Sequence, residues 1–113
     1  MTMTTLKKLW LDDERPEPEG WVRAKTASQA ILHLSTHRFG EVSLDHDLGP
    51  DSSGTGYQVA VWLEDEAMTN PSFPIPIVHI HTANPSARVK MALAVKNINE
   101  ARRARKQAED AAS

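Results

Sequence analysis

The chain has 113 residues, a formal net charge of −2 and no cysteine. Its length suits one domain with a modest core, and the absence of cysteine excludes disulfides, zinc–thiolate sites and cysteine nucleophiles. The charge gives no overall sign of a nucleic-acid-binding protein, and no apolar run resembles a signal peptide or could span a membrane. We therefore expect a soluble cytoplasmic protein with one domain over residues 1–113 and a core over about residues 6–99.

Strand and helix patterns alternate in the first half of the chain. Residues 6–11 and 21–25 predict strands, and residues 15–20 between them hold two prolines and a glycine, which exclude regular structure. Residues 26–29 match a capping box, which predicts the start of a helix. Residues 41–44 predict a third strand. Apolar residues of the predicted helix fall on one face at helical spacing: Ala27, Ala30, Ile31 and Leu34.

The middle of the chain continues this alternation. Residues 49–56 form a glycine- and serine-rich loop, and residues 57–67 predict a helix. Residues 75–82 predict a fourth strand, and Pro76 near its start favours an edge position in a sheet. The residues of the predicted helix that should face inward are Val59, Ala60, Leu63 and Ala67.

A last helix is predicted to begin with Asn84 as its N-cap and Pro85 at its first position. Beyond Glu100 the chain is rich in Arg and Lys and then in Ala, which indicates either a solvated helix end or a frayed tail. The alternation of strands and helices indicates an α/β domain with a short, mostly parallel four-stranded sheet and right-handed crossovers. In such sheets ligands bind beyond the carboxyl ends of the strands.

Acidic residues follow two of the predicted strands. Asp12 and Asp13 come directly after the first strand, and Asp45 and Asp47 come after the third. On neighbouring parallel strands these carboxylates would meet and repel one another unless a cation or protons intervened. Because such oxygens suit hard cations, the pattern indicates a site for Mg²⁺ or Mn²⁺, and the alternative is a pair of solvated turns.

Histidines could add proton-transfer chemistry to the same edge. His46 lies between two aspartates, whose charges favour its protonated form and a role as proton donor, and a solvated turn is the alternative. His79 and His81 lie two apart on the fourth strand and therefore face the same side. Because His81 is nearer the carboxyl end, we expect it to be catalytic and His79 to be a core or supporting histidine.

A third cluster could bind a phosphate. The Thr82 hydroxyl, the N–H groups around Asn84 at the helix start and the Arg88 guanidinium could all donate hydrogen bonds to phosphate oxygens. The alternative is that Asn84 only caps the helix. Further along this helix, basic residues form either a solvated face or a contact with an RNA backbone. These residues are Lys96, Arg102, Arg103, Arg105 and Lys106.

Four motifs occur in order along the chain: Leu-Asp-Asp-Glu-Arg-Pro at 11–16, Ser-Leu-Asp-His-Asp-Leu-Gly at 43–49, Thr-Gly-Tyr at 55–57 and His-Thr-Ala-Asn-Pro at 81–85. With these motifs the chain resembles, over roughly residues 7–92, the cyclic-phosphate-processing receiver domains. These are compact relatives of the response-regulator receiver. The resemblance implies a compact flavodoxin-like or receiver-like three-layer fold.

The resemblance also implies roles for individual residues. In receivers an acidic pair that ends the first strand binds Mg²⁺, and Asp12 and Asp13 match this pair. Asp45 matches the aspartate that accepts a phosphoryl group, and Asp47 matches the residue whose carbonyl binds the metal. Thr82 matches the residue that contacts the phosphoryl group.

The chain departs from the receiver pattern in two places. The segment between Asp13 and the second strand is too short for the usual first helix, and no fifth strand carrying the receiver lysine follows Thr82. Loss of that lysine argues against an ordinary phosphorylation switch. His46 and His81 are additional to the receiver pattern and suit acid–base chemistry on a phosphate ester.

These patterns favour metal-dependent processing of a phosphoester, either a 2′,3′-cyclic phosphate end or a cyclic nucleotide. Asp45, His46 and His81 would be catalytic, and Asp45 could also accept the phosphoryl group covalently. The alternative is a non-catalytic module that binds metal plus phosphate or accepts phosphate for regulation, and a third reading is a structural cation only. The expected partner is a phosphate-containing small molecule or an RNA end, with no membrane, and the sequence does not decide the oligomeric state.

Overall fold

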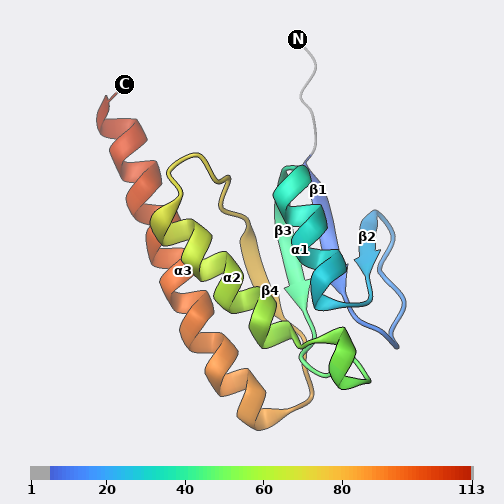
Figure 1. The fold of residues 1–113 in the computed structure, drawn as a ribbon. Helices are drawn as coiled ribbons and strands as arrows, with labels where there is room; N and C mark the ends of the chain where they lie inside the picture. Colours follow the sequence, from blue (N-terminus) through green and yellow to red (C-terminus); the bar gives the residue numbers. More distant parts are fainter. Residues whose placement is uncertain (1–5, 113) are drawn as a thin grey trace.

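The structure is a computed structural model that describes residues 6–112, so both ends of the predicted domain lie outside the described residues. Strands and helices alternate after the second strand, as Figure 1 shows. The strands are β1 (Lys7–Leu11), β2 (Trp21–Ala24), β3 (Phe39–Leu44) and β4 (Ile77–Ile80). The helices are α1 (Ala27–Thr36), α2 (Gly56–Thr69) and α3 (Pro85–Ala112), with a short 3₁₀ helix η1 (Asp51–Ser53) between β3 and α2.

The four strands form one sheet in the order β2-β1-β3-β4, and every pairing between them is parallel. β1 and β3 are therefore central, and their residues Leu9, Leu11, Val42 and Leu44 are fully buried. β4 lies at an edge, as Pro76 predicts. The α/β class, the parallel sheet and the receiver-like order of elements are confirmed.

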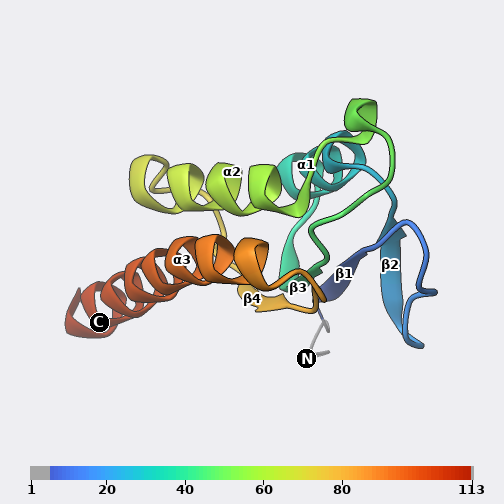
Figure 2. The ribbon, with the colours of Figure 1, turned by 90° about the horizontal axis from the view of Figure 1, so that it is seen from below.

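The helices of the described chain cover one face of the sheet. Figure 2 shows α1 and α2 above the strands, with α3 beside α2 and above β4. The opposite face carries no helix from residues 6–112, so the sheet and its helices form two layers rather than the expected three. The cause is the connection from β1 to β2, which is too short to hold a helix. We call this uncovered side the open face; its residues are Lys8, Trp10, Trp21, Arg23, Glu41, Ser43, Ile77 and His79.

Two Thr-x-x-Gln sequences start helices, and only one of them closes a full capping box. At α1 the Thr26 hydroxyl accepts the Gln29 N–H at 3.1 Å, but the Gln29 side chain accepts the N–H of Lys25 instead of that of Thr26. At α2 both bonds of the box form between Thr55 and Gln58. The capping box predicted at residues 26–29 is thus half formed, and the complete box at Thr55 and Gln58 was not predicted.

α3 runs to Ala112, so the basic segment after Glu100 is helical and not a frayed tail. Two of its arginines bind backbone carbonyls of the segment before β4. Arg102 donates to the carbonyl of Pro76 at 3.1 Å, and Arg105 donates to three carbonyls. The three acceptors are the carbonyls of Ala67, Asn70 and Phe73.

Apolar packing follows the predicted helical faces. The inward residues predicted for α2 are all buried, and those of α1 are buried except Ile31, which is partly buried. None of the helices in residues 6–112 carries an apolar stretch sufficient to cross a bilayer.

Candidate functional site

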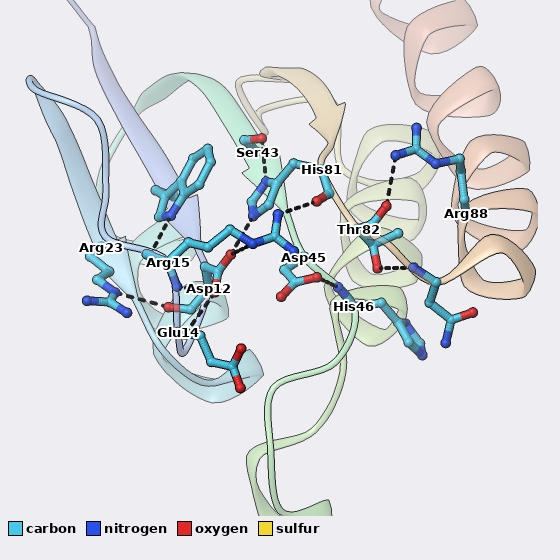
Figure 3. A network of polar contacts seen from close by, with 12 residues as sticks. Asp12, Glu14, Arg15, Arg23, Ser43, Asp45, His46, His81, Thr82 and Arg88 are labelled. Atoms are coloured by element: carbon cyan, nitrogen blue, oxygen red, sulfur yellow. Dashed lines mark hydrogen bonds and ion pairs between the residues drawn. The ribbon is translucent and has the colours of Figure 1, made fainter.

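Three side chains converge at the carboxyl edge of the sheet. Asp12 follows β1, Asp45 follows β3 and His81 follows β4. The backbone ladder continues one residue past the strands, because the Asp45 N–H donates to the Leu11 carbonyl and the His81 N–H donates to the Leu44 carbonyl, each at 3.0 Å. One donor atom from each side chain lies within 4.8 Å of the others. Figure 3 shows the three side chains close together, and we call Asp12, Asp45 and His81 the Asp-Asp-His group.

Asp12 is fully buried and is held by several hydrogen bonds. Its Oδ1 accepts the N–H groups of Glu14 and Arg15, each at 2.8 Å, and its Oδ2 lies 3.1 Å from His81 Nε2. Burial alone would raise the pKa of Asp12, but the hydrogen bonds from Arg15, Glu14 and His81 and the charge of Arg15 together lower it. Asp12 is therefore an ionised carboxylate despite its burial.

His81 is fixed on three sides. Its Nε2 meets Asp12, its Nδ1 lies 2.7 Å from the Ser43 hydroxyl, and its ring stacks on Trp10 with centroids 3.9 Å apart. Burial lowers the pKa of His81 and outweighs the opposing effects of Asp12 and Asp45. The imidazole is therefore neutral at neutral pH, as a metal ligand or a base must be. The Ser43 hydroxyl can donate or accept, so it can support either tautomer.

Arg15 lies beside the Asp-Asp-His group and was not predicted as a site residue. Its guanidinium donates to the His81 carbonyl at 2.9 Å, and its Nε lies 3.6 Å from Asp12 Oδ2. The Trp10 indole donates to the Arg15 carbonyl at 3.1 Å and so holds this loop over the edge of the sheet. Ser43 is the other residue that sequence reasoning missed.

The structure does not bring the Asp13 and Asp47 carboxylates into the Asp-Asp-His group. Asp47 is exposed and forms an isolated antiparallel bridge with Thr55. Asp13 lies next to Gly49, where an added Cβ would be 3.2 Å from Asp13 Oδ2. The wider set of four carboxylates therefore stays a prediction, and the carboxylates that converge here are those of Asp12 and Asp45.

His46 lies next to Asp45 but turns its ring away from the group, as Figure 3 shows. Its N–H donates to Asp45 Oδ1 at 2.8 Å. Its Nδ1 is buried and has no hydrogen-bond partner anywhere in the described chain. A buried ring nitrogen without a partner is costly, so this position favours an additional group that would satisfy it.

The glycine loop packs against the chain itself. The Gly56 N–H donates to the His46 carbonyl at 3.0 Å, and a Cβ on Gly56 would overlap the Asp45 carbonyl oxygen. Gly56 therefore allows α2 to approach the Asp45–His46 backbone.

The predicted phosphate subsite is a closed turn in this structure. The Asn84 N–H donates to the Thr82 hydroxyl at 3.2 Å, and Arg88 donates to the Thr82 carbonyl at 2.8 Å. The Asn84 side chain accepts the N–H of Ala87 at 3.1 Å, which confirms its role as the N-cap of α3. Thr82 is 1% exposed. These residues therefore stabilise the turn between β4 and α3.

His79 was expected to be a core or supporting histidine. It lies instead on the open face with its side chain 49% exposed, and its Nε2 is 3.0 Å from Glu41 Oε1. The core expectation is wrong because the open face has no covering layer.

The donor set of the Asp-Asp-His group fits a divalent cation. Two carboxylates could balance its charge, and a neutral imidazole offers one nitrogen. Carboxylate oxygens suit Mg²⁺ and Mn²⁺, whereas imidazole suits transition metals, so the mixed set fits Mn²⁺ better than Mg²⁺.

A comparison with curated proteins finds no match to this chain. A comparison with family models matches residues 7–97 to the family described as "Cyclic-phosphate processing Receiver domain". The match spans all the strands and every residue of the Asp-Asp-His group. The chain therefore belongs to the cyclic-phosphate processing receiver domain family.

Proposed function

We propose that the protein processes cyclic phosphate esters, either of nucleotides or of RNA ends, with a divalent cation held by Asp12, Asp45 and His81. The observation that carries this proposal is the convergence of three metal-compatible donors at the carboxyl edge of a parallel sheet, within 4.8 Å of one another. This edge is where open α/β sheets bind ligands. The expected ion is Mn²⁺ or Mg²⁺, with Mn²⁺ favoured by the imidazole donor.

Bound here, a divalent cation would polarise a phosphoryl oxygen and lower the pKa of a coordinated water. The protein's own groups would position the ester. The guanidinium of Arg15, half exposed beside Asp12, offers charge-assisted hydrogen bonds to phosphate oxygens. Asp45 could also accept the phosphoryl group as a nucleophile.

Proton transfer would fall to His46. The orphaned Nδ1 of His46 offers a site for a ligand oxygen or a water, which suits a general acid acting on the leaving oxygen. His81 would act as a metal donor or as the general base, since its neutral form is favoured. Thr82, Asn84 and Arg88 would hold the turn that follows His81 and orient the phosphate at the start of α3.

The test is turnover of a panel of cyclic phosphates with Mn²⁺, with Mg²⁺ and with chelator. The panel contains 2′,3′-cyclic mononucleotides, 3′,5′-cyclic nucleotides and an RNA that ends in a 2′,3′-cyclic phosphate. Asp45→Asn should abolish metal-dependent product. Asp51→Asn removes an equal charge from the exposed helix η1 and should leave turnover unchanged. Absence of product from every substrate, with metal binding intact, would reject the enzyme proposal.

A second candidate is a non-catalytic module that binds metal plus phosphate. The orientation of the His46 ring, away from the Asp-Asp-His group, favours it. His46→Gln separates the two candidates, because it should abolish turnover by an enzyme while metal affinity stays near that of the unmodified protein. A module that only senses ligand would show no turnover in either protein.

A further inference from the structure

The open face combines aromatic rings with cations. The strand register places Trp21, Lys8 and Glu41 in one row across the sheet, and Arg23 and Trp10 lie in the next row. The two indole rings meet edge to face at 6.0 Å, and Lys8 Nζ lies 5.6 Å from the Trp21 ring centroid. Glu41 is the acid of this face, and it is paired with Lys8 at 3.4 Å. A surface of this composition is too polar to pack against an apolar layer of protein.

At its carboxyl end the open face reaches the Asp-Asp-His group. Trp10 stacks on His81, and both lie on this side of the sheet. A ligand whose phosphate end occupies the group therefore has Trp10 as its first neighbour on the open face, with Trp21 beyond it.

At the amino end of the sheet the surface is hollowed and basic. Two adjoining hollows of about 420 and 350 Å³ share Arg38, Arg102 and Lys106. The smaller hollow is also lined by Arg103 and by Ile77, which belongs to the open face. We call these two together the basic hollow. Glu109 and Asp110 line only the larger one.

Three cations of the basic hollow are available to a ligand. Arg102 is bound to a backbone carbonyl, whereas Arg38, Arg103 and Lys106 form no ion pair within residues 6–112. Burial, and then the charge of Arg103, lower the pKa of Arg102. The local charge is therefore positive although the whole chain carries −2. Most of these cations lie beyond residue 97, where the family match ends.

We propose that the open face binds single-stranded RNA, with the 3′ end at the Asp-Asp-His group, bases against Trp10 and Trp21, and the backbone phosphates in the basic hollow. The placement of the 3′ end rests on the proposed function. Strands of four to six residues at about 3.3 Å per residue separate the two ends by roughly 13–20 Å, a span that suits a few nucleotides. Cations interleaved with aromatic rings are the usual means of holding single strands, and an acidic protein would need the cations alone.

The test measures binding and does not depend on turnover. Fluorescence anisotropy would follow an RNA of about eight nucleotides that ends in a 3′-phosphate, at several salt concentrations. Each of Arg38→Gln, Arg103→Gln and Lys106→Gln should reduce the slope of log affinity against log salt by about 0.7. Lys90→Gln is the matched control, because Lys90 lies over Tyr57 on the helical side and should leave the slope unchanged.

A further variant tests the aromatic contribution. Trp21→Leu should weaken RNA binding roughly 10-fold, the scale expected for one stacked base, while the melting temperature reports whether the fold is intact. Equal slopes in the three variants and in Lys90→Gln would overturn the proposal. Polyglutamate that competes as well as RNA would also overturn it and would indicate an acidic protein partner.

The outcomes separate this inference from the proposed function. RNA binding with the expected slopes, but no turnover of any cyclic phosphate, would reject the enzyme and keep the binding surface. Turnover of cyclic mononucleotides without RNA binding would reject the binding surface and keep the enzyme.

Discussion

Gly56 is the position at which one methyl group should disturb the whole site. In Gly56→Ala the new Cβ would overlap the Asp45 carbonyl oxygen and lie 2.7 Å from its carbonyl carbon and 3.1 Å from His46 Cα. Relief requires a shift on the order of 1 Å, and the neighbours are backbone atoms that cannot rotate away. We expect a loss of about 3 kcal/mol in the free energy of unfolding, the upper part of the overpacking range, or roughly 10 °C in melting temperature.

The same shift should displace the Asp45 carboxylate from Asp12 and His81. A displacement of about 1 Å in a catalytic group can cost roughly 100-fold in rate, and we expect a loss of this size in metal-dependent turnover. Differential scanning calorimetry would measure the loss of stability, and a turnover assay with Mn²⁺ would measure the loss of rate. Gly40→Ala is the matched control, since its Cβ meets only the exposed Leu6 side chain, which can move. A melting temperature of Gly56→Ala equal to that of Gly40→Ala would refute the reasoning.

Two further predictions concern stability. Arg105→Ala removes hydrogen bonds to three carbonyls, and we expect the free energy of unfolding, measured by urea denaturation, to fall by about 2–4 kcal/mol. Arg105→Lys should recover part of this loss, and equal stability of the two variants would contradict the prediction. The folded-state pKa of His81 lies below 6.5, so the unfolded state binds more protons and stability should fall as pH decreases below 6.5. In chelator, the free energy of unfolding should drop as the pH falls through about 6.5, and His81→Gln should show a smaller drop. Identical drops in the two proteins would assign the effect to another group.

The meeting of the strand tips could be predicted from the sequence. Asp12, Asp45 and His81 each follow an apolar run, and carboxyl ends of parallel strands share one edge. Which of two neighbouring acids points inward could not be predicted, because Asp13 and Asp47 have the same local chemistry as Asp12 and Asp45. Their direction depends on the path of the loops after the strands.

The contacts by which Arg15 and Ser43 hold the site could not be predicted from local patterns. Arg15 contacts the carbonyl of His81 across 66 positions, and Ser43 contacts the ring of His81 across 38. Neither has a spacing signal. The same limit applies to the two Thr-x-x-Gln sequences. The Gln29 side chain accepts the N–H of Lys25, whereas the Gln58 side chain accepts the N–H of its own N-cap residue, Thr55.

The layer count shows a different limit. The short segment between β1 and β2 correctly predicts a missing helix, but its consequence for the sheet depends on which face that helix would have covered. Right-handed crossovers place the β2-to-β3 and β3-to-β4 connections on one side and the β1-to-β2 connection on the other. The loss of a single helix therefore exposes Trp10 and Trp21 together.

The arginines of α3 also constrain the order in which the molecule can fold. Four carbonyls between Ala67 and Pro76 accept hydrogen bonds from Arg102 and Arg105, which lie up to 38 positions later in the chain. During synthesis, β1 and β3 can pair before these residues emerge, but the end of α2 and the approach to β4 lack their partners. The last turns of α3 should thus be needed to complete the folding of the end of α2 and of the segment before β4, after the sheet has begun to form.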